Sequence, residues 1–279
     1  LIGYTETGDW KSCLKVCMQK VNFRTLYDFV IICALDMERS AFEGVRQANF
    51  SYGELMVSYG LNVREMSIGE LRGACVLQPR MGLVDASITA TRALNAFNPK
   101  LLCMSGICGG FADEVPLGAL LVSEISWEHQ AGKWCDGAFE LRSYQESLDP
   151  EILLLISQLI ERDPSLSDLA SKKFEMAVPN AGVFIKPTTS GSSVIASEQY
   201  AEMIKRQHGK AAGIDMEVFG IHRAAKLHNE KIICFAAKTV VDHANEKKSD
   251  DIQEAGAILS ARFVVKVIDG LLNSHSLSK

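Results

Sequence analysis

From Asp28 onward, short apolar runs rich in Val, Ile and Leu alternate with segments whose apolar residues recur at helical spacing. Such runs are typical of strands buried on both faces, in a sheet that helices cover. Expected strands span residues 29–35, 73–78, 101–106, 119–125, 183–185 and 232–240, and expected helices span residues 37–47, 83–96, 150–161, 197–208, 216–228 and 251–272. The alternation predicts an α/β fold around a largely buried sheet.

Residues 1–27 differ from this pattern, because their apolar residues from Trp10 to Val21 fall on one side of a helix that ends before the first expected strand. Two interpretations stay open: a helical extension of the same domain, or the tail of an upstream domain. We expect residues 28–279 to form one large domain, because a chain with 47% apolar side chains can bury a substantial core. The stretch 130–181 is a long excursion with one expected helix, of the kind that often forms a lid or a partner-contact surface.

Charge and cysteine content narrow the classes of partner. The net charge is −5 and its charges are scattered, so we expect no nucleic-acid surface. The longest apolar runs, residues 30–35 and 152–159, are too short to cross a bilayer, and no charged leader precedes an apolar stretch, so neither membrane association nor a secretory signal is expected. The eight cysteines lack the paired spacing of a zinc site. We therefore expect a cytoplasmic protein with reduced thiols, no metal and a small-molecule partner.

Three glycines lie within Met104-Ser-Gly-Ile-Cys-Gly-Gly-Phe111, directly after an expected strand. Glycines let a backbone turn sharply and approach a ligand closely, so we interpret the segment as a ligand-binding turn. Tight packing without a ligand would account for these glycines equally well. The segment lacks the spacing of a dinucleotide-binding loop and the Lys-Ser/Thr ending of a phosphate-binding loop, and both sites are set aside.

Carboxylates stand at the ends of three expected elements. Glu38 follows the first strand, and Asp242 ends the last one. Asp215 and Glu217 flank Met216 at the start of an expected helix. Each carboxylate alone has a structural interpretation, as a first-turn helix acid or a capping residue. Their joint order along the chain, with the glycine segment between them, is what points to chemistry.

This order resembles the nucleoside phosphorylase and nucleosidase superfamily, most closely its methylthioadenosine/S-adenosylhomocysteine nucleosidase branch, over about residues 28 to 272. The motifs that carry the resemblance are Ala34-Leu-Asp-Met-Glu38 for the family's Ala-Met-x-x-Glu, Ser105-Gly-Ile-Cys-Gly-Gly110 for Thr-Gly-x-x-Gly-Gly, Ser190-Gly-Ser-Ser-Val-Ile195 for the base-pocket Ser-Gly-Asp segment, Asp215-Met-Glu217 for Glu-Met-Glu, and Val241-Asp-His-Ala244 for Ser-Asp-x-Ala. The resemblance implies a three-layer α/β/α fold with a central mixed, largely buried sheet, and makes residues 28–279 a nucleosidase domain.

The resemblance also implies how the site works. Cleavage of an N-glycosidic bond passes through an oxocarbenium-like state, so the base must become a better leaving group and a nucleophile must be held under the sugar carbon. By the family's pattern, Asp242 donates a proton to N7 of a purine, Glu38 activates the attacking water, and Glu217 holds the ribose hydroxyls. An Asp at this position suits a 6-aminopurine such as adenine. The other implied substrate contacts are Met216, Gly106, Ile107, Cys108, Gly109, Val194, Ile195 and Asp215, and no cofactor or metal is implied.

Departures from the family's pattern bear on the reaction and the substrate. The superfamily's phosphorylases bind phosphate through arginines after the first strand and just before the glycine segment, where this chain has Leu35-Asp-Met and Cys103-Met-Ser. Hydrolysis is therefore favoured, while Arg80 keeps phosphorolysis open as an alternative. Val194 stands where the nucleosidases stack a Phe on the base, and Lys238 where an Arg is common, so base contacts stay open.

Segments 197–215 and 238–251 resemble nucleosidase modules attached to signalling or antiphage defence proteins, whose substrate can be a nucleotide such as ATP. Arg80, Lys186 and Lys238 are the candidate phosphate contacts. The resulting prediction is an N-glycosidic hydrolase that releases adenine from a nucleoside or nucleotide, with ATP as the substrate in an antiviral defence role. The alternatives are a phosphate-dependent purine nucleoside phosphorylase and a non-catalytic module that senses nucleosides or nucleotides. A homo-oligomer and an upstream signalling domain or partner protein are also implied.

Overall fold

The computed structural model describes residues 27–142, 144–166, 182–229, 231–245 and 252–275. The helix expected within residues 1–27 lies, apart from Tyr27, outside the described residues. Residues 167–181 of the 130–181 excursion also lie outside them. Among the described helices, none is both long and apolar enough to cross a bilayer.

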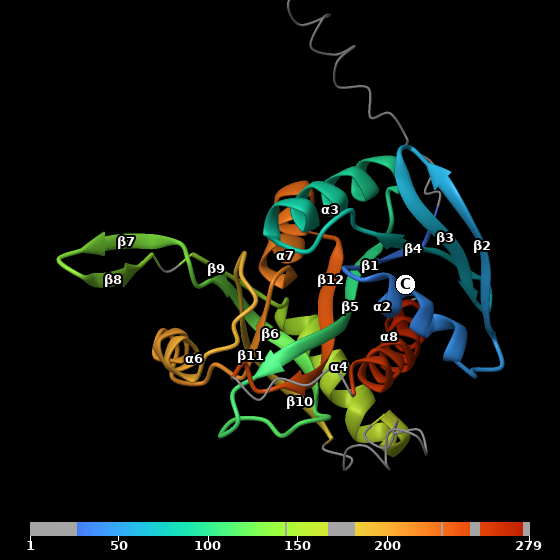
Figure 1. Ribbon diagram of the computed structural model, residues 1–279. Coiled ribbons are helices and arrows are strands. Elements are labelled where there is room, and N and C mark those ends of the chain that lie inside the picture. The colour runs from blue at the N-terminus through green and yellow to red at the C-terminus, as the bar shows by residue number, and fades with distance from the viewer. Residues whose placement is uncertain (1–26, 143, 167–181, 230, 246–251, 276–279) are drawn as a thin grey trace, which may run out of the picture.

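A ten-stranded sheet runs through the molecule in the order β11-β10-β6-β12-β5-β1-β4-β3-β2, with β9 alongside β6 (Figure 1). The strands are β1 (Phe29–Cys33), β2 (Phe50–Ser58), β3 (Leu61–Ile68), β4 (Leu71–Leu77), β5 (Leu101–Gly110), β6 (Leu120–Glu128), β9 (Gln145–Ser147), β10 (Val183–Ser190), β11 (Gly213–Asp215) and β12 (Ile233–Asp242). Strands β4, β1, β5 and β12 are parallel, whereas β12 and β6 are antiparallel. The expected mixed sheet is confirmed.

One half of this sheet closes on itself. Strand β11 pairs in parallel with β10 on one side and antiparallel with the end of β5 on the other. As a result, β5, β12, β6, β10 and β11 form a barrel-like ring, while β1 to β4 extend from it as an open sheet. The closure brings Asp215 at the end of β11 next to the last residues of β5 and β12.

Helices cover both faces, which confirms the three-layer arrangement (Figure 1). On one face, α3 (Leu83–Phe97) packs against α7 (Val218–His228) over a core that holds Val30, Ile32 and Leu102. On the other face lie α2 (Asp36–Ser40), the 3₁₀ turn η1 (Ala41–Gly44), α4 (Pro150–Arg162), the 3₁₀ turn η2 (Pro164–Leu166) and α8 (Gln253–His275), and α6 (Glu198–Lys205) lies beside β11. Strand β1 contributes alternate residues to the two cores, as expected for a strand buried on both faces.

The glycine segment corrects the sequence prediction, because it is a strand and not a turn. Strand β5 continues to Gly110, four residues beyond its expected end at 106. Its glycine half pairs with β12 from Lys238 to Asp242 and with β11. A Cβ atom at Gly110 would come within 2.6 Å of Val240, so the glycines allow strands to approach closely here. Tight packing is therefore one of their roles.

Several elements were not predicted. The β2–β3 hairpin was missed because β2 is almost wholly exposed and lacks a continuous apolar run. Within the 130–181 excursion, a hairpin of β7 (Gly132–Cys135) and β8 (Ala138–Leu141) precedes β9 and the expected helix α4. The hairpin projects from the body of the molecule, beyond α6 (Figure 1).

Candidate active site

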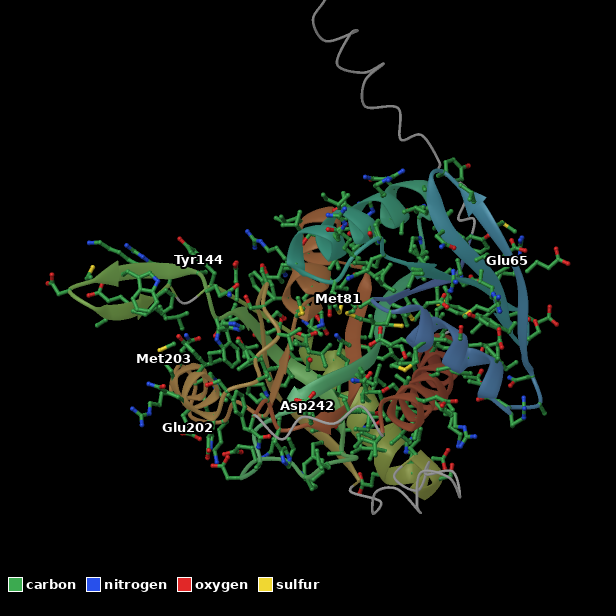
Figure 2. The ribbon with its side chains drawn as sticks, viewed as in Figure 1. Glu65, Met81, Tyr144, Glu202, Met203 and Asp242 are labelled. Atoms are coloured by element: carbon green, nitrogen blue, oxygen red, sulfur yellow. The ribbon has the colours of Figure 1, made fainter. Side chains whose placement is uncertain are left out.

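A pocket of about 300 Å³ lies where β1, β12 and β11 end, and it contains all three of the predicted catalytic carboxylates. Glu38 enters it from α2 just after β1, Glu217 from the residue before α7, and Asp242 from the end of β12. The carboxyl ends of parallel strands are the usual place for ligand-binding groups in an α/β sheet. Figure 2 shows Asp242 in the interior of the fold and Met81 on its α3 side.

Glu38 is held rigidly by backbone groups. Its Oε2 accepts hydrogen bonds from the amides of Ala34 (2.8 Å) and Leu35 (3.0 Å), and its Oε1 accepts one from the amide of Ile107 (2.9 Å). A Cβ at Gly106 would lie 2.2 Å from Oε1, so only glycine leaves room for this carboxylate. Burial raises the pKa of Glu38, with the charge of Glu217 adding to the effect and Lys238 and the amide donors opposing it.

Glu217 belongs to a buried ionic network centred on Lys238. Its Oε1 accepts a hydrogen bond from the amide of Gly82 (2.9 Å), and its Oε2 lies 2.9 Å from Nζ of Lys238. The same Nζ is 2.7 Å from Oδ2 of Asp215. Burial alone would lower the pKa of Lys238, but the surrounding carboxylates raise it well above its usual range. Lys238 is therefore a permanent cation that partly neutralises the site.

Asp215 fixes the geometry of the loop that carries Glu217. Its Oδ1 accepts a 2.5 Å hydrogen bond from the Ser190 hydroxyl, and its Oδ2 accepts one from the amide of Val218 (3.1 Å). The sequence placed Asp215 to Glu217 at the start of a helix, whereas Asp215 ends β11 and the helix begins at Val218. Met216 and Glu217 form the turn between strand and helix, and both line the pocket.

Asp242 lies at the opposite side of the glycine segment from Glu38. It is 7% exposed, and its Oδ1 accepts a hydrogen bond from the amide of Ala244 (2.8 Å) and would lie 3.0 Å from a Cβ at Gly109. Glu38 thus contacts β5 at Ile107 and Asp242 contacts it at Gly109. The points at which the two carboxyl groups contact β5 are therefore two residues, or about 7 Å, apart along the strand.

The pocket lining includes most of the other predicted substrate contacts. Met216, Ile107, Cys108, Gly109, Val194, Ile195 and Asp215 all line it, whereas Gly106 lies behind Glu38 and does not. Sequence reasoning missed Ala34, Leu35, Met81, Ser193, Ile214, Val241, Ala244 and Gln253. It also missed Gln78 and Ser190, which bind the carboxylates from outside the pocket lining. Ala34, Leu35, Ser190, Ser193, Val241 and Ala244 lie within the motifs quoted from the sequence, although no contact was assigned to them. Gln78, Met81, Ile214 and Gln253 carry no such signal, because tertiary packing alone brings them to the site.

The candidate phosphate contacts do not gather at the pocket. Lys186 donates to the carbonyl and carboxylate of Glu114 and is absent from the lining, and the ammonium of Lys238 is held by two carboxylates. Arg80 precedes the lining residue Met81 and does not itself line the pocket. Among the described residues, no group of three or more His, Cys, Asp or Glu could hold a metal ion.

Comparisons with known proteins identify the family and the fold. The model of the family described as "Phosphorylase superfamily" matches residues 28–271. The uncharacterized protein y4jS of Sinorhizobium fredii is 26% identical and matches 91% of this chain, which spans 64% of its length. A 5′-methylthioadenosine/S-adenosylhomocysteine nucleosidase of Desulfotalea psychrophila is 25% identical over 72% of this chain and 80% of its own.

Two further comparisons concern a longer relative and a solved structure. The ATP nucleosidase Cap17 of Escherichia coli is 23% identical over 83% of this chain, which spans about half of it, 49%. A solved structure of the 5′-methylthioadenosine/S-adenosylhomocysteine nucleosidase of Neisseria meningitidis superposes with a TM-score of 0.68 at 16% identity, over 86% of this chain and 97% of that one. This structural likeness shows the shared fold.

Proposed function

This chain belongs to the phosphorylase superfamily, and on that premise we propose that it hydrolyses the N-glycosidic bond of an adenine nucleoside. The observation that carries the proposal is the convergence of Glu38, Glu217 and Asp242 on one pocket. Nucleosidases among its relatives, in Desulfotalea psychrophila and Escherichia coli, support the same reaction class.

In this mechanism, two carboxyl groups act on opposite sides of the scissile bond. Asp242 donates a proton to N7 of the base, and the C1′–N9 bond breaks with its electron pair moving to the base. Glu38 takes a proton from a water molecule, whose oxygen forms the new bond to C1′. The two groups contact β5 at different residues, Ile107 and Gly109, so each can act on its own part of the substrate. Glu217 holds the ribose hydroxyls, and Met216 packs against the sugar.

The charges around the pocket support hydrolysis over phosphorolysis. Four carboxyl groups line it, those of Glu38, Asp215, Glu217 and Asp242, against the single described cation Lys238, and three of them remain charged when Asp242 holds the proton that it donates. Because Lys238 is already paired with two of them, an orthophosphate nucleophile would meet net negative charge. The same argument favours a nucleoside whose 5′ group carries no phosphate. ATP is the second candidate substrate, supported by the similarity to Cap17.

The wider setting is part of the same proposal. We place the reaction in the cytoplasm, because the described cysteines are free thiols. We also propose that the chain forms a homo-oligomer and acts beside a further signalling domain or partner, in antiviral defence. The match to 64% of y4jS and 49% of Cap17 supports the further domain alone, because those relatives carry additional chain.

Chromatographic detection of free adenine tests the proposal. The purified protein is incubated with adenosine, methylthioadenosine, AMP and ATP, each with and without phosphate. Adenine released without phosphate is the expected result, with methylthioadenosine or adenosine preferred over the nucleotides. Release only with phosphate would identify a phosphorylase, and no release from any substrate would favour a sensing module.

A further inference from the structure

A second cavity, of about 560 Å³, opens beside the catalytic pocket and shares Ser193, Val194 and Ile195 with it. We call it the side cavity. Its far walls come from the β7–β8 hairpin and from α6, which face each other across it (Figure 1). The two spaces are therefore separated only by the short segment 193–195, in which the side chain at 194 is small and half exposed.

The walls of the side cavity are mainly apolar and aromatic. They include Trp134 and Phe139 of the hairpin, whose rings lie 5.2 Å apart, and Tyr200, Met203 and Ile204 of α6. Trp134, Tyr200 and Met203 are 66%, 58% and 41% exposed, respectively. Large apolar side chains that are left exposed around a concavity mark a binding site.

The polar groups at the base of the side cavity are already engaged within the chain. Gln207 accepts from the Trp127 indole and donates to the carbonyl of His129, and Gln130 accepts from the amide of Ser192. Burial lowers the pKa of His129 to about 4, so its ring is neutral near pH 7. The Nε2 of His129 is buried and has no hydrogen-bond partner within the described part of the chain. The described lining of the cavity thus offers mainly apolar contact and no charged side chain.

The side cavity lies on the acid side of the catalytic pocket. The amide of Ser197, a side-cavity residue, donates to the carbonyl of Ala244 (3.1 Å), and the amide of Ala244 donates to Asp242. The shared segment therefore packs next to the residue that protonates N7. In a purine, N7 and the amino group on C6 lie on the same edge of the ring. A group attached to that amino nitrogen would leave the base beside Asp242, in the direction of segment 193–197.

We propose that the side cavity receives an apolar substituent on the C6 amino group of the base, so that the substrates include N6-substituted adenine nucleosides. This inference rests on the proposed function, because the position of the base follows from the role of Asp242. An aromatic or branched aliphatic substituent would pack between the hairpin rings and α6, past Val194, which lines both spaces.

Binding of the free bases tests the cavity without requiring turnover. Titration calorimetry compares adenine with N6-benzyladenine on the full chain. We expect N6-benzyladenine to bind at least about tenfold more tightly, because burial of a phenyl ring contributes more than 1.4 kcal/mol. Equal or weaker binding of N6-benzyladenine would overturn the inference.

A matched pair of variants on α6 locates the substituent. Figure 2 shows Met203 on the side of α6 toward the hairpin, and Glu202 on the other side. M203K and E202Q each raise the net charge of the same helix by one, but only Met203 lines the side cavity. We expect M203K to remove most of the tenfold advantage of N6-benzyladenine and to leave adenine binding unchanged, while E202Q changes neither. An equal effect of both variants, or of neither, would contradict the location.

Turnover separates this inference from the proposed function. Suppose that the protein releases adenine from adenosine but cleaves N6-benzyladenosine with a kcat/KM about 100-fold lower. The proposed nucleosidase function would then hold, and the inference about the side cavity would be wrong. Comparable kcat/KM values for the two nucleosides support both. If a second copy of the chain fills the side cavity instead, M203K would alter the molar mass in light scattering and the benzyl group would add no affinity, which also overturns the inference.

Discussion

At the residue scale, Asp242 combines a hydrogen bond within the chain with a role as proton donor. Replacement by Asn keeps the size of the side chain and an oxygen for the amide of Ala244, but removes the titratable proton. We expect D242N to lower kcat by about 10²- to 10⁴-fold and to leave the thermal unfolding midpoint nearly unchanged. Adenine release and circular dichroism measure the two effects. Retained activity in a folded D242N protein would remove Asp242 from the mechanism.

Lys238 is the residue on which the charge balance of the site depends. Its removal would leave Asp215 and Glu217 as buried carboxylates without a cation. We therefore expect K238M to destabilise the protein by about 3 to 5 kcal/mol, as measured by urea unfolding. The same change at the exposed Lys100, which pairs with Asp28 at 2.7 Å, should cost at most about 1 kcal/mol. An equal loss of free energy of unfolding at the two positions would show that the buried ion pairs of Lys238 stabilise the protein no more than an exposed ion pair does.

At the scale of elements, the last residues of β5 lie against the carboxyl groups of Glu38 and Asp242. A methyl group at Gly106 would occupy the position of the Glu38 carboxylate. G106A should therefore displace the Glu38 side chain while β5 itself stays formed. We expect at least about a 100-fold loss of activity and a loss of about 1 to 3 kcal/mol of stability.

The control for this variant is G44A, at a glycine whose added Cβ would meet only ordinary contact with Ile258, at 3.6 Å. It should change neither activity nor stability appreciably. Normal turnover by G106A would mean that Glu38 is not needed in its observed position.

The packing of α7 on β6 carries a pH dependence. His222 of α7 is buried against the Ser126 hydroxyl (2.9 Å), and burial, partly opposed by Asp215, lowers its pKa from 6.5 to about 4. The His222 ring is protonated more readily in the unfolded state than in the folded state. The free energy of unfolding is therefore highest above pH 6.5 and decreases as the pH falls toward 4. The shift corresponds to about 3 kcal/mol.

Urea unfolding between pH 4 and 7 measures this effect. We expect H222Q, which cannot titrate, to show a shallower loss of stability over that interval than the wild type. Parallel curves for the two proteins would assign the acid sensitivity to other groups, His129 among them.

At the scale of the whole molecule, apolar side chains are exposed beside the pocket. Met81, just before α3, and Val84 and Ile88, in its first two turns, are 47%, 67% and 54% exposed, and Met81 also lines the pocket. Exposed apolar groups next to a site are typical of an interface. We expect light scattering to give at least twice the monomer mass, and I88E to shift the protein toward monomer. A strict monomer at working concentration would contradict the proposed oligomer.

Buried elements carry the clearest signal in the sequence. Strands β1, β5 and β12 were predicted because a strand covered on both faces must be apolar along its length, and α3 and α4 because their apolar spacing is helical. Strand β2 carries no such signal, because its residues face solvent. The hairpin β7–β8 was missed for the same reason: its side chains are mostly exposed, so no buried pattern marks the two strands.

The sequence by itself determined which side chains are available for chemistry: the carboxylates of Glu38, Glu217 and Asp242, their order along the chain and the glycines between them. Only the tertiary structure decided that these carboxylates meet, because the register of β12 on β5 and the closure by β11 set their positions. It also decided that Lys238 is a buried counter-ion and that β5 extends through its glycines. A sequence lists charges and glycines, but the dielectric around a charge and the strand facing a glycine depend on residues more than a hundred positions away.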